Sequence, residues 1–238
     1  MLLFYIRHGD PIYNPDSLTP RGQLQAQALA KRLALYGVDR VYTSDSMRAQ
    51  QTAQPTCDLM RLTPTICPWA NEHRPWERMC VFDEEGRREY VFEDPASRRL
   101  FASNEIRDLG DNWGSHPQFK DTTIPQCAAD IGRDADAFLE SLGYRHDLEN
   151  HVYIPVAPTK ERVALFAHQA FGMAFLSHVM DVPYPLFSTR FDTAHSGMTV
   201  IEFREQDGVV IPRILQLSND SHLYREGLPT HYQNRLRF

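Results

Sequence analysis

Short apolar runs bounded by polar residues recur along the chain and predict buried strands. The clearest of them occupy residues 2–6, 40–44 and 162–167. The first run leads into Arg7-His8-Gly9, and the last ends at His168. Runs of this length next to turn residues are typical of strands in a sheet with both faces covered. We therefore expect a sheet in which two strands end in histidines.

The residues between the first two strands predict an amphipathic helix from about Pro20 to about Tyr36. Thr19 can cap the backbone N–H groups at its start, and Pro20 suits the first helical position. Gly37 is a natural end for this helix. We expect its buried stripe to consist of Leu24, Ala26, Ala28, Leu29, Ala30 and Leu33.

Further helices follow the second and third strands. One begins after Asp45-Ser46 with Arg48 in its first turn, and an apolar helix begins after His168. The order strand, helix, strand, helix with short connections favours parallel strands and right-handed crossovers. The predicted fold class is α/β, a three-layer sandwich with a mostly parallel central sheet flanked by helices.

The remaining segments extend this arrangement. The sequence predicts a short strand at 64–68, a helix over 124–142, a charged connection over 144–161, and strands at 198–203 and 209–217 around a turn at 206–208. The segment from about 73 to about 126 is rich in charged and aromatic residues. We expect it to form a mostly helical cap, inserted between strands of the sheet, that selects the organic part of a ligand.

Composition narrows the class of protein. A chain of 238 residues without internal repeats is expected to form a single domain over 1–238, with the cap as an insertion at about 73–126. The net charge of −6 and the lack of basic tracts disfavour nucleic-acid and membrane partners. The four cysteines show no metal-ligand spacing. A reduced, cytoplasmic protein is the simplest interpretation.

The histidines at two strand ends indicate a reactive site. Ligands of open α/β sheets bind outside the carboxyl ends of the strands, where His8 and His168 are expected. Arg7 precedes His8, and Arg48 lies at a helix start, where a cation is unfavourable unless an anion binds beside it. A phosphoryl group needs cations around its oxygens, and an imidazole nitrogen can accept it transiently. The pattern predicts phosphoryl transfer through a phosphohistidine.

Several motifs stand at spacings that are typical of one family. They are Arg7-His8-Gly9 with Asn14, Leu18-Thr19-Pro20-Arg21-Gly22 with Gln25-Ala26, Ser44 through Ala49 with Thr52-Ala53, Ala167-His168, and Leu217 through Leu223. Together they resemble the histidine phosphatase superfamily, in the branch similar to cofactor-dependent phosphoglycerate mutases. The likeness covers both ends of the chain and its middle strand.

The resemblance implies a division of labour among five residues. His8 would be the nucleophile, and Arg7, Arg48 and His168 would surround the phosphoryl group and stabilise its oxygens. Glu72 would act as general acid, and then as base toward water. The resemblance implies neither a metal nor another cofactor.

Other residues are candidates for binding or depart from the family pattern. The resemblance makes Asn14 a neutral donor to the phosphate, and Arg21 and Arg74 are candidates for phosphate or substrate binding. Gln169 and Ala170 stand where the family usually has glycines. Likewise, Arg74-Pro75-Trp76-Glu77 replaces the glycine-containing pattern that follows the glutamate in typical mutases, and Asp10 replaces a frequent glutamate.

The departures favour a metal-independent phosphatase that hydrolyses a small phosphomonoester through a phosphohistidine at His8. Two alternatives stay open: a phosphoglycerate-type mutase with the same chemistry, and a non-catalytic module that binds phosphorylated ligands. The expected partner is a small phosphorylated metabolite, and the chain could form a homodimer. His195 precedes a predicted strand and is not assigned to the site.

Overall fold

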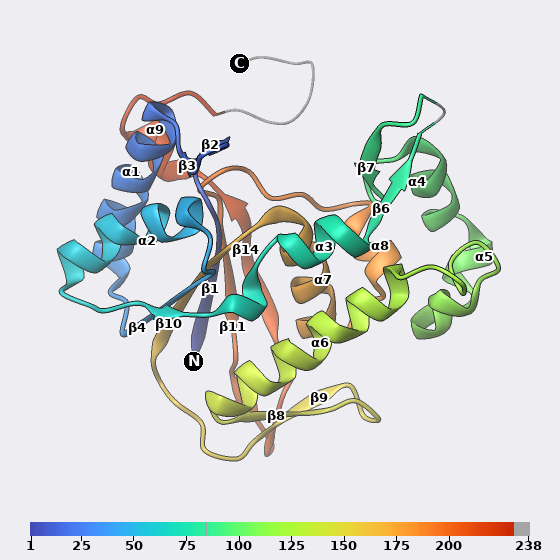
Figure 1. The fold of residues 1–238 in the computed structure, drawn as a ribbon. Coiled ribbons are helices and arrows are strands. Elements are labelled where there is room, and N and C mark those ends of the chain that lie inside the picture. Colours follow the sequence, from blue (N-terminus) through green and yellow to red (C-terminus); the bar gives the residue numbers. More distant parts are fainter. Residues whose placement is uncertain (84, 231–238) are drawn as a thin grey trace. The chain divides into compact units, whose positions relative to one another are not determined.

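The computed structural model describes residues 1–83 and 85–230. The chain divides into two compact units (Figure 1). The first contains residues 1–71, 142–168 and the described residues from 193 onward, and the second contains 72–141 and 169–192. The expectation of one domain with an insertion at about 73–126 stays a prediction.

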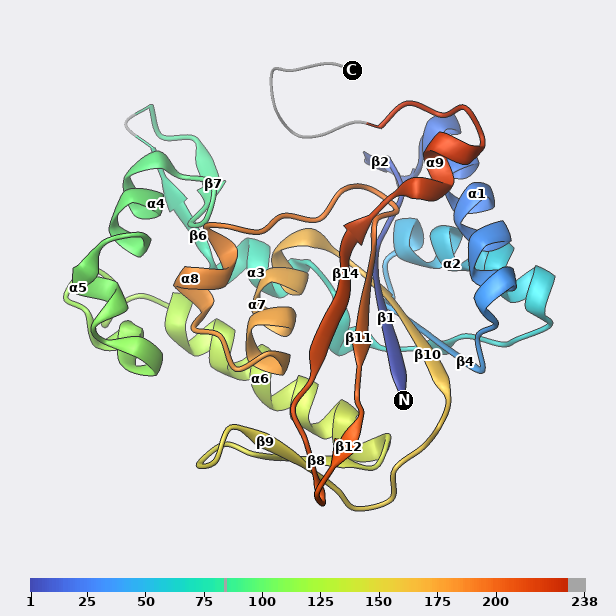
Figure 2. The same cartoon turned by 180° about the vertical axis from the view of Figure 1, so that it is seen from behind.

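A six-stranded sheet forms the centre of the first unit (Figures 1 and 2), in the order β14-β11-β1-β10-β4-β5. Its strands are β1 (Leu2–Arg7), β4 (Arg40–Thr43), β5 (Thr65–Ile66), β10 (Arg162–Ala167), β11 (Met198–Glu202) and β14 (Arg213–Asn219). The pairs β1–β10, β10–β4 and β4–β5 are parallel, whereas β11 runs antiparallel to both of its neighbours. The predicted α/β class with a mostly parallel central sheet flanked by helices is confirmed.

Two helices of the first unit, α1 (Pro20–Tyr36) and α2 (Met47–Met60), pack on one face of this sheet. Phe4, Ile6 and Phe166 from the strands meet Leu29 and Leu33 of α1 in the core. The alternate residues of β1 and β10 are also fully buried, so both faces of these strands are covered. That double burial explains why the strands read as continuous apolar runs.

The start of α1 agrees with its sequence signals, but its inward face differs from the expectation at one position. The hydroxyl of Thr19 accepts a hydrogen bond from the backbone N–H of Gly22, as predicted for a cap. Leu24, expected in the buried stripe, is 49% exposed. Gln25 is buried instead, because its side-chain oxygen accepts a hydrogen bond from the backbone N–H of Asp10.

Small sheets and hairpins complete the first unit. The hairpin of β2 (Pro11–Tyr13) and β3 (Asp16–Leu18) follows β1, and a short 3₁₀ turn covers Pro68–Ala70. A four-stranded sheet contains β8 (Tyr144–Asp147), β9 (Val152–Pro155), β12 (Glu205–Gln206) and β13 (Val209–Val210). The prediction of a plain connection over 144–161 was therefore wrong. Charged residues interrupt its apolar positions, which hides the strand periodicity.

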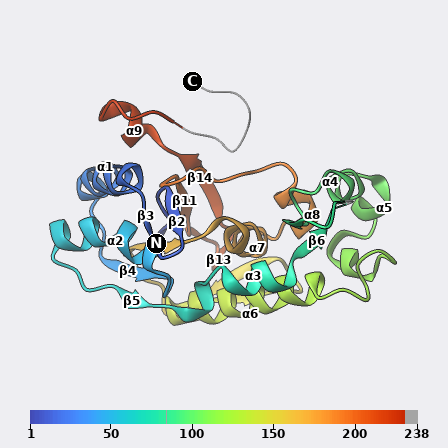
Figure 3. The same cartoon turned by 45° about the horizontal axis from the view of Figure 1, so that its top comes forward.

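The second unit is mainly helical (Figure 3). Its helices are α3 (His73–Arg78), α4 (Pro95–Phe101), α5 (Asn104–Arg107), α6 (Ile124–Ser141), α7 (Gln169–Val179) and α8 (Tyr184–Ser188), with a 3₁₀ segment at Gly110–Ser115 and a hairpin of β6 (Cys80–Phe82) and β7 (Arg88–Tyr90). Rings of Phe101, Trp113, Phe119 and Tyr184 pack together in it. Across the described residues, no helix is both long and apolar enough to cross a lipid bilayer.

Gly22→Ala tests the close approach of α1 to the turn after β1. A Cβ atom at Gly22 would lie 2.3 Å from the carbonyl oxygen of Asp10, so the backbone has to shift. We expect a loss of about 2 kcal/mol in the free energy of unfolding, measured by urea denaturation. Gln23→Ala, at the next and exposed position of the same helix, should change it by less than about 0.5 kcal/mol. Equal stability of both variants would contradict this packing.

Candidate active site

The pairing of β1 with β10 brings two histidines side by side. Arg7 lies opposite Ala167 in the parallel register, and the backbone N–H of His8 donates to the carbonyl of Ala167 over 2.9 Å. His8 and His168 directly follow these paired residues, and their ring centroids are 5.2 Å apart. The structure therefore joins the two imidazoles that the sequence assigned to one sheet edge.

His8 is held as a neutral imidazole with a defined tautomer. Its Nδ1 lies 2.7 Å from the carbonyl oxygen of Gly9, and because a carbonyl only accepts, Nδ1 carries the proton. Nε2 is then the unprotonated, nucleophilic nitrogen. The residue is 3% exposed. Burial, followed by the charges of His168, Arg7 and Arg48, lowers the pKa of His8 well below its ordinary value.

His168 is also neutral, and both of its ring nitrogens are engaged. Nε2 contacts the hydroxyls of Ser44 at 2.8 Å and Ser46 at 3.3 Å. Nδ1 accepts a hydrogen bond from the Arg48 guanidinium at 3.2 Å, so the ring proton is on Nε2. Burial, followed by the charges of Arg48 and Arg7, lowers the pKa of His168 well below its ordinary value.

Arg48 lies in the first turn of α2, as expected from the sequence. Its second guanidinium nitrogen donates to a carboxylate oxygen of Asp16 over 2.8 Å. The other oxygen of this carboxylate accepts from the backbone N–H of Met47. Asp16 therefore supplies the negative charge that both the helix start and the arginine favour. Asp16 thus provides an anion at this place, and the role of Arg48 as a phosphate ligand stays a prediction.

Arg7 places a second cation next to the same histidines. Its side chain is buried, and one guanidinium nitrogen donates to the carbonyl oxygen of Thr193 over 2.5 Å. Buried guanidinium groups beside neutral imidazoles form a preorganised site for an oxyanion. Arg7, His8, Arg48 and His168 can together hold a phosphoryl group and offer it a nucleophilic nitrogen.

The other candidates lie in different surroundings. Asn14 is exposed in the turn between β2 and β3, and Arg21 is exposed in the first turn of α1. In the described part of the chain, neither forms a hydrogen bond or an ion pair with His8 or His168. Arg74, in the second unit, donates to Asp134 of α6 over 2.5 Å.

Glu72 is the first residue of the second unit and holds the start of α7. Its two carboxylate oxygens accept hydrogen bonds from the backbone N–H groups of Ala170 at 2.9 Å and Phe171 at 2.8 Å. A carboxylate at a helix start satisfies N–H groups that have no partner within the helix, and it interacts favourably with the helix dipole. Glu72 is therefore fixed by the backbone and is not a solvated loop residue.

His195 is a site residue that the sequence did not lead us to assign. Its ring centroid lies 5.5 Å from that of His8, and its Nδ1 is 3.6 Å from a carboxylate oxygen of Asp10. The sequence signal was a histidine in Thr193-Ala194-His195-Ser196-Gly197 directly before β11. That signal was weak, because β11 runs antiparallel to β1 and brings its beginning, not its end, to the histidine edge.

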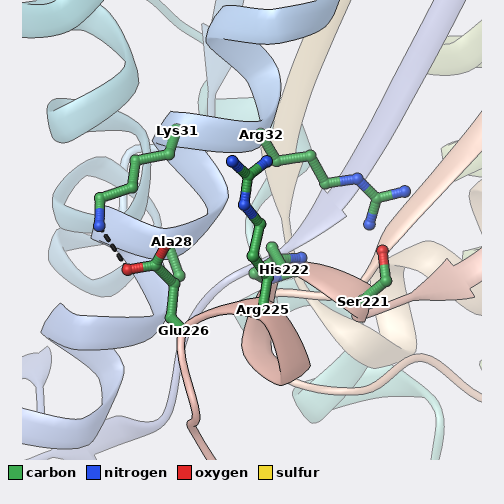
Figure 4. Close-up of a pocket in the computed structure, with 7 residues that line it drawn as sticks. All are labelled: Ala28, Lys31, Arg32, Ser221, His222, Arg225 and Glu226. Carbon is green, nitrogen blue, oxygen red and sulfur yellow. Dashed lines mark hydrogen bonds and ion pairs between the residues drawn. The ribbon is translucent and has the colours of Figure 1, made fainter.

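A separate pocket of about 100 Å³ lies between α1 and α9 (Ser221–Arg225) in the first unit (Figure 4). Lys31 on its wall pairs with Glu226, and Arg32 donates to Asn219 and Gln216. Glu226 thus compensates the charge of Lys31, neutral oxygens accept the hydrogen bonds of Arg32, and we assign no ligand to this pocket.

Comparison with known sequences relates part of the chain to one superfamily. Residues 3–105 match the histidine phosphatase superfamily (branch 1). A probable phosphoglycerate mutase of Yersinia enterocolitica, GpmB, is 30% identical over 105 residues, which are 37% of this chain and 49% of that protein. A PE-PGRS family protein of Mycobacterium tuberculosis is 34% identical over 83 residues, 30% of this chain and 14% of that protein. The chain thus spans half or less of the length of these relatives.

Comparison of folds extends the likeness to most of the chain. A phosphoserine phosphatase of Entamoeba histolytica, solved as a mutant in complex with phosphoserine, superposes with a TM-score of 0.59. The match has 18% sequence identity and covers 93% of this chain and 98% of that one. At this identity, the match supports the fold.

The neutral state of the two buried histidines has a measurable consequence. Unfolding lets His8 and His168 bind protons near pH 6.5, whereas in the folded protein their lowered pKa values prevent this. The free energy of unfolding is therefore expected to fall as pH decreases below about 6.5. Urea denaturation at pH 7, 6 and 5 measures this fall. The His8→Gln variant has one buried imidazole fewer and should lose less stability over this range, and an equal slope would contradict the assignment.

Proposed function

Because residues 3–105 match the histidine phosphatase superfamily (branch 1), we propose that the chain belongs to this superfamily and is a metal-independent phosphatase acting on a small phosphomonoester. The observation that carries the proposal is the state of His8. Its Nδ1–H donates a hydrogen bond to the carbonyl of Gly9, and its neutral ring lies among Arg7, Arg48 and His168. This arrangement supports attack by Nε2 on phosphorus.

In the first half of the reaction, the lone pair of His8 Nε2 forms a bond to phosphorus. The bond between phosphorus and the ester oxygen breaks, and its electron pair leaves with that oxygen, which takes a proton from a general acid. Arg7 and Arg48 stabilise the charge on the three non-bridging oxygens. Because these guanidinium groups supply the positive charge, the proposal needs no metal.

In the second half, a water oxygen attacks phosphorus and gives a proton to a base. The bond between phosphorus and Nε2 breaks, its electrons return to His8, and inorganic phosphate leaves. The imidazole is regenerated with its proton still on Nδ1, so the carbonyl of Gly9 keeps the same partner throughout. The cycle consumes one water and one phosphomonoester.

The pairing of cations in the second unit favours hydrolysis over a mutase reaction. A mutase must hold a bisphosphorylated intermediate, whose second phosphate needs cations of its own. Arg74 and Arg78 of α3 are bound to Asp134 and Asp130 of α6. To bind a second phosphate, they would have to share or give up these carboxylate partners.

Glu72 is the proposed proton carrier. The proposal comes from the resemblance at this position, and the structure adds that two backbone N–H groups at the start of α7 hold the carboxylate in place. Glu72 would protonate the leaving oxygen and then accept a proton from the attacking water.

His8→Ala tests the phosphohistidine route. With p-nitrophenyl phosphate and a chelator present, we expect wild-type protein to release phosphate and the variant to lose at least about 1,000-fold in kcat/KM, because the nucleophile is absent. An assay of phosphate release gives kcat/KM for the wild-type protein and for the variant. His146→Ala is the matched control, since His146 stacks on Tyr153 in the β8–β9 hairpin of the same unit.

The other outcomes separate the alternatives. Turnover that survives in His8→Ala, or that chelator abolishes, would overturn the proposed route. Exchange of phosphate between substrate isomers much faster than phosphate release would identify a mutase. Tight phosphate binding without turnover of a broad substrate panel would identify a binding module.

Glu72→Gln tests the proton carrier through the leaving group. An alkyl phosphate leaves as a strongly basic oxygen and needs the acid, whereas p-nitrophenolate leaves without it. We expect kcat/KM to fall about 100-fold or more for the alkyl substrate and much less for the aryl one. Glu77→Gln on the exposed side of α3 is the control. Equal losses for both substrates would show that Glu72 acts only by holding α7.

A further inference from the structure

We propose that His195 is a third imidazole of the phosphoryl site, that Asp10 orients it, and that it donates a hydrogen bond to a non-bridging phosphoryl oxygen. The inference rests on the proposed function and adds a residue to it. It also gives Asp10, which departs from the family pattern, a defined task.

The position of His195 supports this role. Its ring centroid is 5.5 Å from that of His8, close to the 5.2 Å that separates His8 from His168. The two planes of His8 and His195 are inclined by 33°. The ring of His195 thus lies nearly as close to the nucleophile as the ring of His168 does, and its side chain is only 10% exposed.

Asp10 is itself rigidly placed. One carboxylate oxygen accepts a hydrogen bond from the Thr19 hydroxyl at 2.7 Å, and the backbone N–H donates to Gln25 at 2.8 Å. The other carboxylate oxygen is the one that lies 3.6 Å from Nδ1 of His195. A carboxylate at one ring nitrogen orients an imidazole and directs its other nitrogen, Nε2, to act on a ligand.

The surroundings of His195 differ in charge from those of the other two imidazoles. His8 faces a carbonyl oxygen, and His168 faces two hydroxyls and Arg48. Within the described part of the chain, only His195 of these three has a carboxylate beside it. An acidic partner stabilises an imidazolium, which donates from both nitrogens, so His195 is suited to carry positive charge when a phosphate dianion binds.

The backbone around His195 is held in an unusual conformation. Ser196 has a φ of 58°, which is uncommon for a residue other than glycine. Its N–H donates to the carbonyl of His8 over 3.1 Å, and its hydroxyl contacts Nε2 of His222 at 2.9 Å. The N–H of Ala194 donates to the Ser218 hydroxyl over 2.7 Å. Uncommon backbone conformations that several hydrogen bonds maintain are frequent at functional sites, where they orient a side chain.

The position of His195 beside His8 decides between two possible roles: binding the non-bridging oxygens and protonating the leaving group. In an in-line transfer, the leaving group departs on the side of phosphorus opposite the nucleophile, whereas the non-bridging oxygens spread around the nucleophile's axis. A ring that lies beside His8, as His168 does directly after β10, is placed for those oxygens. His195 therefore stabilises oxygen charge and does not protonate the leaving group.

The test compares His195→Ala with His195→Gln, which keeps an N–H donor. We expect kcat/KM to fall about 100-fold in the alanine variant and about 10-fold in the glutamine variant, equally for aryl and alkyl phosphates. The affinity for inorganic phosphate, measured by calorimetry, should fall in the same order. His146→Gln is the control for replacing a histidine, and thermal unfolding of each variant verifies folding.

Asp10→Asn tests the orienting role by a double-mutant cycle. We expect a loss of several-fold in kcat/KM in Asp10→Asn alone, and no additional loss when it is combined with His195→Ala, because the residue then has nothing left to orient. Additive losses would show that Asp10 acts elsewhere and would overturn its part of the proposal.

Two outcomes separate this inference from the proposed function. If His195→Ala keeps activity and phosphate affinity within about two-fold while His8→Ala is inactive, the inference fails and the phosphatase proposal stands. Activity in His8→Ala would overturn the proposed function itself. A larger loss for alkyl than for aryl phosphates in His195→Ala would make His195 a proton donor and overturn its role as a ligand of the non-bridging oxygens.

Discussion

The parallel pairing of β1 with β10 is the constraint on which the site depends. Its register sets Arg7 opposite Ala167, so the next residue of each strand is a histidine at the same sheet edge. A shift of one residue would exchange the side chains that β1 presents to the two faces of the sheet and would separate the two rings. Because both faces of these strands are buried, packing fixes the register, and the register fixes the chemistry.

The charges of the site are arranged around that pair. Arg7 and Arg48 are largely removed from water, and the pKa values of both imidazoles lie well below the ordinary one. Protonating either ring would add a third positive charge where burial already disfavours it. A bound dianion would compensate the positive charges of both guanidinium groups at once and would remove this excess of positive charge. The folded protein thus keeps the proposed nucleophile neutral at a place where two guanidinium groups suit an oxyanion.

The sequence predicted most of this arrangement because its main signals are local. Apolar runs located β1 and β10, and Thr19 and Gly37 bounded α1 within one residue. The misses come from contacts between distant segments. Gln25 is buried in place of Leu24 because its side-chain oxygen accepts a hydrogen bond from the backbone N–H of Asp10. The pattern of hydrophobic positions does not reveal such a hydrogen bond. His195 comes to His8 through an antiparallel strand that is distant in sequence, so its proximity required the sheet order.

Several candidate site residues lie where the chain passes from one unit to the other. The chain passes from one unit to the other at Asn71–Glu72, Ser141–Leu142, His168–Gln169 and Asp192–Thr193. Three of these four steps lie at or within three residues of a candidate site residue. Glu72 also holds the first N–H groups of α7, the helix that begins directly after His168. Substitutions at these positions therefore change local backbone support as well as reactivity, and the two effects separate only when unfolding and leaving-group dependence are measured on the same variants.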